Sequence, residues 1–115
     1  MKLLTKKIAE QLRVNGEKQR EAGGNLDLMP VVKLFTPDGA ATWLLTHTYP
    51  NHPDIAFGLC DLGMGFPELG DVRISELESV RGVFGLPVER DLHFTADKTI
   101  SEYGSIAIKA QRITV

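Results

Sequence analysis

The sequence has one cysteine, few aromatic residues and no strong excess of either charge. A single cysteine, Cys60, cannot form a disulfide within the chain, and its place in an apolar run predicts a buried thiol. Aromatic residues make up 7% of the chain, so no platform of rings is visible on which nucleic-acid bases could stack. These shortages exclude a disulfide-stapled fold and argue against a base-stacking protein.

The charges nearly balance, because 13 Lys and Arg residues against 15 Asp and Glu residues leave a net charge of −2. Binding to phosphate backbones usually needs a basic excess. The first twenty residues are a local exception, with six Lys or Arg residues and two acidic ones. Lys6, Lys7 and Arg13 are therefore candidate contacts to DNA phosphates, and the alternative is a solvated helix face.

Long apolar segments are also missing. The N-terminal stretch MKLLTKKIAEQL carries a charge every few residues, unlike the apolar core of a signal peptide. No window reaches the length of a membrane span. We therefore expect a cytoplasmic protein that makes no membrane contact.

The chain does have enough apolar residues for one domain, since 43% of its 115 residues are hydrophobic. A chain of this length buries roughly two-thirds of its unfolded surface. We predict an N-terminal helix (1–20), a linker (21–30), a sheet core (31–94) with a helix at 76–81, and a C-terminal helix with its tail (95–115). This order predicts an α+β fold: a small antiparallel or mixed sheet of about four to five strands with the three helices packed on it.

The expected strands are apolar runs separated by turn residues. Val31–Phe35 and Thr42–Tyr49 flank the turn TPDGA, which predicts a hairpin. Ile55–Leu62 is apolar on both faces, so we expect a central strand. The glycines of GMGFPELG indicate hairpin geometry, and a weak strand, Asp71–Ile74, follows them.

Capping residues mark the expected helix ends. Ser75 with Glu78 has the spacing of a capping box, and Gly82 is expected to end that helix in the left-handed conformation. Thr99 with Glu102 has the same spacing and predicts the start of the C-terminal helix.

One expected strand, VERDLHF, concentrates polar side chains. A strand period of two places Glu89, Asp91 and His93 on one face. Two acids and a histidine suit acid–base catalysis or metal binding, so these residues are the candidate catalytic set. Same-face neighbours stand roughly 6.5–7 Å apart, so a metal would need ligands from a second element. The alternative is a solvated or ion-paired face on a strand anchored in the core by Leu92 and Phe94.

A second polar cluster lies in the Pro-rich segment HTYPNHPD, which we expect to form a loop over 47–54. Its His47, His52 and Asp54 are candidate binding residues. A metal site would gain support only if this loop lay beside His93. The alternative is a polar surface loop.

Trp43 and Arg90 complete the candidate binding residues. Tryptophan is frequent in binding surfaces, because its apolar ring also carries a polar N–H. No recognised spacing of metal or cofactor ligands occurs in the chain, so we predict neither a metal nor a cofactor.

Three long blocks occur together and in order: VVKLFTPDGAATWLLT, DIAFGLCDLGMGFPELG and SELESVRGVFGLPVERDLHF. With them the chain resembles a bacterial family known as a domain of unknown function, number 2958, from about Leu3 to Phe94 and more loosely in the tail. The resemblance implies a small cytoplasmic protein often carried on plasmids and other mobile DNA. It supplies no established activity and no catalytic residues.

The sequence supports three functional hypotheses. The first is a non-enzymatic accessory protein of mobile DNA that binds an unknown protein or nucleic-acid partner through the sheet edge, the 47–54 loop and the polar side of 89–93. The second is a small metal-dependent or acid–base enzyme that uses the 89–93 face with the 47–54 cluster. The third is a DNA-binding module that uses the basic first helix. We expect a monomer or a weak homodimer.

Overall fold

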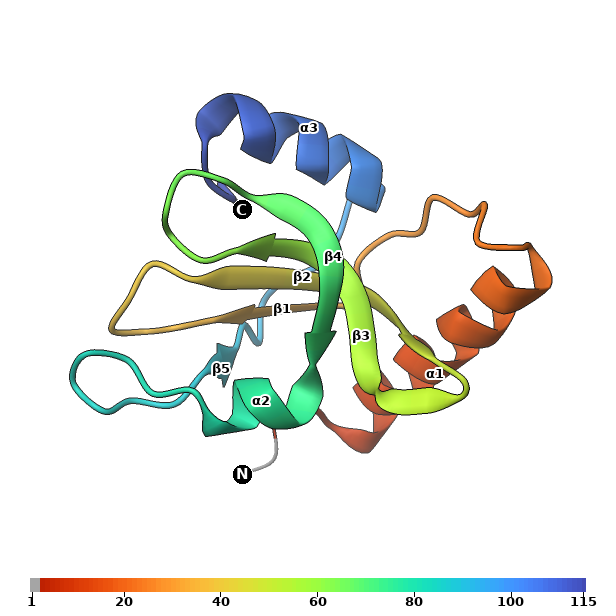
Figure 1. Cartoon of the computed structure of the whole chain (residues 1–115), viewed down its shortest axis with the longest axis horizontal. Helices are drawn as coiled ribbons and strands as arrows, with labels where there is room; N and C mark the ends of the chain where they lie inside the picture. The colour runs from red at the N-terminus through yellow and green to blue at the C-terminus, as the bar shows by residue number, and fades with distance from the viewer. Residues whose placement is uncertain (1–2) are drawn as a thin grey trace.

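A five-stranded antiparallel sheet forms the centre of the protein (Figure 1). The computed structural model describes residues 3–115. The strands are β1 (Val32–Phe35), β2 (Thr42–Tyr49), β3 (His52–Asp61), β4 (Glu68–Arg73) and β5 (Glu89–Arg90). The helices are α1 (Lys6–Glu21), α2 (Ile74–Ser79) and α3 (Ile100–Ala110). The fold is α+β, as the sequence predicts.

The strand order across the sheet is β4-β3-β2-β1-β5, and every neighbouring pair runs antiparallel. Because side chains alternate along a strand, β2 faces two cores. Trp43 and Leu45 belong to a core shared with α1 and α2, whereas Leu44 belongs to a core shared with α3. No helix within residues 3–115 is long and apolar enough to cross a membrane.

Helix α1 covers the part of β2 that β1 leaves unpaired. β1 pairs only with residues 42–45 of β2. Beyond them, the Nδ2 of Asn15 donates a hydrogen bond of 2.9 Å to the carbonyl oxygen of Thr46. A Cβ at Gly16 would lie 1.9 Å from the carbonyl oxygen of Thr48, so only glycine allows this close approach. The helix therefore closes an open sheet edge.

The predicted start of the C-terminal helix is confirmed. Thr99 precedes α3, and Thr99 and Glu102 form both bonds of a capping box. The box satisfies backbone N–H groups that have no partner inside the helix.

The prediction for the short helix is wrong in its bounds and in its cap. The helix covers 74–79 rather than 76–81, and Ser75 lies inside it. The backbone N of Ser75 donates to Asp54 Oδ1 at 3.0 Å, and the Ser75 hydroxyl donates to Oδ2. Asp54, on β3, therefore accepts the hydrogen bond from the Ser75 backbone that the predicted capping box assigned to Glu78.

Gly82 does not adopt the predicted left-handed conformation, which occurs instead at Gly85, with φ of 82°. Helix α2 ends at Ser79 and the chain continues extended at Val80. A Cβ at Gly82 would lie 1.6 Å from Asp38 Oδ1. Gly82 therefore leaves room for the Asp38 carboxylate and does not end the helix.

Three connecting segments meet at one end of the sheet, which we call the loop end. They are residues 36–41 between β1 and β2, residues 62–67 between β3 and β4, and residues 80–88 before β5. The antiparallel registers place all three together, on the left in Figure 1. Helix α1 and the β2–β3 turn lie at the opposite end.

Candidate functional site

The structure divides the candidate catalytic residues. β5 ends at Arg90, and the chain turns after Asp91 because Asp91 Oδ1 accepts the backbone N–H of His93 at 2.9 Å. That bond, with Lys33 3.5 Å from Asp91 Oδ2, lowers the pKa of the Asp91 carboxyl. The prediction that Glu89, Asp91 and His93 share one strand face is therefore wrong.

The prediction that Leu92 and Phe94 anchor this strand in the core is correct for Phe94 only. Phe94 packs against the core beneath α3, but Leu92 is 73% exposed. The strand alternation that placed Leu92 inside stops with β5. The guanidinium of Arg90 donates to the carbonyl oxygen of Leu3, so this candidate binding residue holds the N-terminal segment against the sheet.

The predicted loop at 47–54, which overlaps the predicted strand at 47–49, is mostly strand. β2 continues to Tyr49 and β3 begins at His52, which leaves a two-residue turn. His47 is buried, stacks on Phe57 with ring centroids 5.4 Å apart, and its Nδ1 lies 2.8 Å from the hydroxyl of Thr46. Burial lowers the pKa of His47. The local prolines suggested a loop that cross-strand pairing overrides.

His52 and Asp54 lie on β3, where His52 lines the same pocket as His47 and Asp54 does not. His52 is exposed at the start of the strand. Both oxygens of Asp54 accept hydrogen bonds from Ser75, and these bonds lower the pKa of the Asp54 carboxyl. Among residues 3–115, no three His, Cys, Asp or Glu side chains are grouped closely enough to hold a metal ion.

The basic candidates lie on α1. Lys6 and Lys7 are exposed in its first turn. Arg13 is paired with Glu10, with Nη2 and Oε1 2.6 Å apart, and this pair lowers the pKa of Glu10. The partner carboxylate offsets the charge of Arg13, and phosphate binding by this helix stays a prediction.

A groove of about 400 Å³ lies on the face of the sheet that carries Trp43. We call it the concave groove. Its lining comes from β2, β3, β4 and the loop between β3 and β4, namely Trp43, Cys60, Leu62, Met64, Phe66, Glu68, Gly70, Asp71 and Val72. Its size is that of a binding site for a small ligand or for side chains of a partner.

The floor of the concave groove follows from the sheet register. Trp43 pairs with Cys60 across β2 and β3, and Cys60 pairs with Glu68 across β3 and β4. Trp43 is 4% exposed and contributes to the core below. Burial, and then the charges of Glu68 and Asp71, raise the pKa of the Cys60 thiol to about 11. The thiol is therefore neutral at physiological pH, in an environment that is apolar and negative.

The loop beside the groove exposes apolar side chains. Leu62, Met64 and Phe66 are all exposed, and Phe66 is 81% exposed. The predicted hairpin geometry is confirmed, because Gly63 and Gly65 have φ of 81° and 86°. Sequence reasoning explained these glycines and missed the apolar residues between them. The signal was present, since turn residues are normally polar.

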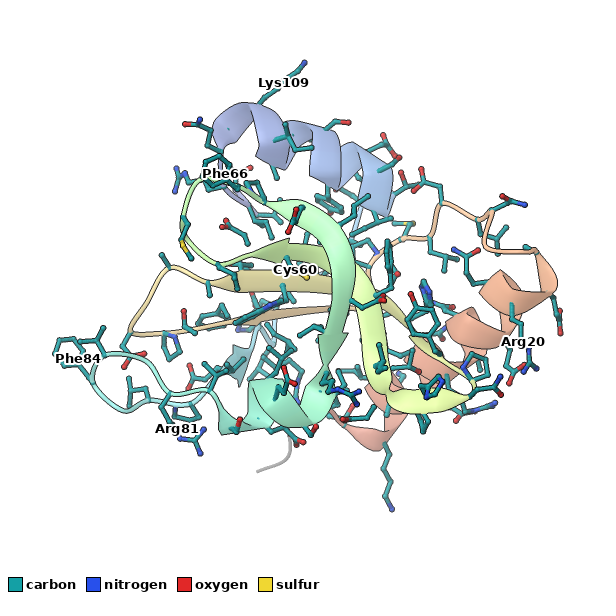
Figure 2. All side chains as sticks on the ribbon, viewed as in Figure 1. Arg20, Cys60, Phe66, Arg81, Phe84 and Lys109 are labelled. Carbon is teal, nitrogen blue, oxygen red and sulfur yellow. The ribbon has the colours of Figure 1, made fainter. Side chains whose placement is uncertain are left out.

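The 80–88 segment carries a second apolar tip at the same end of the sheet. Val83 is 86% exposed and Phe84 is 82% exposed. Both lie in a turn closed by a hydrogen bond of 2.9 Å from Gly85 N to Gly82 O. In Figure 2 Phe84 projects from the left edge of the molecule, away from the sheet.

Asp38 holds this second tip in place. Its Oδ2 accepts the backbone N–H of Phe84 at 2.7 Å and that of Leu86 at 3.3 Å. The carboxylate comes from the turn between β1 and β2, so the two segments are fixed together. The tip is therefore an ordered turn with exposed apolar residues.

Comparison with known proteins identifies a family. No curated protein and no solved structure matches the chain. The model of a family described as "Protein of unknown function (DUF2958)" matches residues 3–114, which is almost the whole chain. This match confirms the resemblance seen in the three sequence blocks. The chain therefore belongs to the DUF2958 family.

Proposed function

We propose that this protein is a non-enzymatic, cytoplasmic accessory protein of bacterial mobile DNA that acts by binding a partner protein at its loop end. The mobile-DNA setting rests on the family resemblance alone. The binding role rests on one observation: two loops at the loop end expose six apolar side chains, and three of them line the concave groove. These residues are Leu62, Met64, Phe66, Val83, Phe84 and Leu86.

Exposed apolar side chains that gather in one region favour a binding role. Single exposed apolar residues are normal on proteins, but clusters mark interaction sites or ligand grooves. Aromatic anchors carry much of the binding energy in protein interfaces. Phe66 and Phe84 are the aromatic residues that the two loops offer.

The order of these loops supports the same role. A turn that must be ordered on binding costs conformational entropy, and a turn ordered in advance avoids that cost. The hydrogen bonds from Phe84 and Leu86 to Asp38 provide this order. The 80–88 tip thus presents its apolar residues in a fixed arrangement.

Affinity purification tests this proposal. Tagged wild-type protein and a Phe66→Ser, Phe84→Ser double variant are purified from the host, and bound proteins are identified by mass spectrometry. The purified partner is then titrated into each protein by calorimetry. We expect the double variant to bind at least about tenfold more weakly.

A matched control is Ile108→Ser, which removes an exposed apolar side chain from α3. This variant is expected to bind the partner as the wild type does. A partner that binds the double variant with wild-type affinity, or no specific partner in any preparation, would refute the proposal.

A further inference from the structure

Strand β4 lies at one edge of the sheet and has no strand on its outer side among the residues that the structure describes. It is six residues long, whereas β5, at the other edge, has two. An edge strand presents unpaired backbone N–H and C=O groups that can pair with another chain. β4 is therefore the edge at which an added strand could form the longer ladder.

The open edge and the concave groove are adjacent, because four residues of β4 line the groove. In recognition by strand addition, backbone hydrogen bonds provide affinity and neighbouring pockets for alternate side chains provide specificity. The period of two places every second side chain of an added strand on the groove side. Edge and groove supply the two parts of this recognition mode.

The groove combines apolar surface with negative charge. Trp43 and Phe66 contribute aromatic surface, and Glu68 is the charged side chain on the groove face of β4. Asp71 also borders the groove but alternates to the other face of the strand. Asp71 Oδ1 accepts the hydroxyl of Tyr49 at 2.6 Å. Glu68 takes part in none of the ion pairs found within residues 3–115. A complementary ligand therefore carries apolar and basic side chains.

Gly70 keeps the middle of the groove open. A Cβ at this position would have no atom within 4 Å, and the φ of Gly70 is not positive. A larger residue would therefore fit the backbone. Glycine in a strand interior stabilises the strand less than a residue with a side chain does. Gly70 therefore lowers the stability of β4 and leaves space for the side chain of an added strand.

We propose that an extended segment of a partner protein, with apolar side chains and at least one Lys or Arg, adds as a strand to β4 and seats alternate side chains in the concave groove. The inference rests on the proposed function, because it specifies the ligand of the same surface. The basic side chain pairs with Glu68, and an apolar side chain fills the space beside Gly70 and packs on Val72.

Two short peptides test the inference, with binding measured by calorimetry. Both peptides alternate threonine with residues intended for the groove. These residues are lysine and leucine in one peptide and glutamate and leucine in the other. At low salt the lysine peptide is expected to bind at least about tenfold more tightly than the glutamate peptide. Equal binding of the two peptides, or binding of neither, would overturn the inference.

Two variants localise the binding. Gly70→Leu fills the groove and should lower the affinity for the lysine peptide at least about tenfold while thermal melting shows an intact fold. Glu68→Lys reverses the charge at an exposed position and should make the glutamate peptide the preferred ligand. Wild-type affinity for the lysine peptide in both variants would overturn the inference.

Backbone methylation of the lysine peptide tests strand addition directly. Methyl groups on the nitrogens that face β4 should abolish binding, because those N–H groups donate to the ladder. Methyl groups on the alternate nitrogens should leave binding intact. Equal effects of the two sets would contradict strand addition.

The two proposals can fail separately. If a partner depends on Phe66 and Phe84 but neither peptide binds, only the strand-addition inference fails. If no partner is captured and neither peptide binds, both fail. A wild-type dimer in sedimentation that Gly70→Leu dissociates would assign the edge to a second copy of the chain and overturn the inference.

Discussion

The two ends of the sheet differ in the exposure of their apolar residues: they are buried at the α1 end and exposed at the loop end. At the α1 end, Leu12 is fully buried and Gly16 lies against the backbone of β2. At the loop end, Phe66 and Phe84 face solvent, each on a hydrogen-bonded turn. Because both ends are hydrogen-bonded, order alone does not distinguish them. The difference lies in what the apolar residues contact, and it separates a region that stabilises the fold from a region available for binding.

Gly16, at the α1 end, and Gly70, beside the concave groove, differ in the same way. A Cβ at Gly16 meets a backbone oxygen at 1.9 Å, whereas a Cβ at Gly70 meets nothing within 4 Å. The first glycine is needed for packing. The second leaves space in the concave groove.

The largest expected effect comes from one substitution made at both glycines. Gly16→Val forces α1 away from β2, and we expect it to lower the free energy of unfolding by more than about 4 kcal/mol or to prevent folding. Gly70→Val should change the free energy of unfolding by no more than about 0.5 kcal/mol, since valine suits a strand. Urea denaturation measures both. Similar decreases in the free energy of unfolding of the two variants would contradict the proposed difference between the two glycines.

A second pair compares leucines at the two ends. Leu12→Ala removes a fully buried side chain and should cost about 2–5 kcal/mol. Leu62→Ala removes an exposed side chain and should cost less than about 0.5 kcal/mol. Chemical denaturation of both variants checks this prediction. If Leu62→Ala lowered the free energy of unfolding as much as Leu12→Ala does, the loop end would belong to the core.

Asp38→Ala tests whether the second tip is held by its hydrogen bonds. The variant leaves the N–H groups of Phe84 and Leu86 without their carboxylate acceptor, which should cost about 1 kcal/mol. Hydrogen exchange of those two amides should accelerate. Unchanged exchange rates would show that the tip is ordered by other contacts.

The smallest effect concerns pH. Burial lowers the pKa of His47, so below the unfolded-state value of about 6.5 the unfolded chain binds the proton more readily. Stability should therefore fall as the pH drops below this value and level off below the folded-state pKa. His47→Gln should reduce this slope, whereas His52→Gln, at an exposed position, should keep it. Urea titrations at several pH values measure the slopes.

The sequence was sufficient where local patterns act alone. Thr42–Tyr49 is a strand at the expected bounds, and Thr99 with Glu102 caps α3 as its spacing predicts. In both places the deciding contacts lie within the element or with a neighbouring strand of matching pattern.

Long-range contacts decided the places where sequence reasoning failed. Ser75 binds Asp54, 21 residues earlier, and Gly82 packs on Asp38. The failure at Asp91 has a local cause instead, because its side chain accepts the backbone N–H of His93, two residues on, and turns the chain where the strand pattern predicted a continuation. The exposed apolar residues at 62–66 and 83–86 were visible in the sequence, but their exposure depends on what the fold leaves uncovered.

Photo-crosslinking most directly tests whether the loop end binds a partner. A benzophenone amino acid replaces Phe66 in one variant and Ile108, an exposed residue of α3, in another. After irradiation in the host, we predict a specific crosslinked product at position 66 and none at position 108. No product at position 66, or the same products at both positions, would contradict the account.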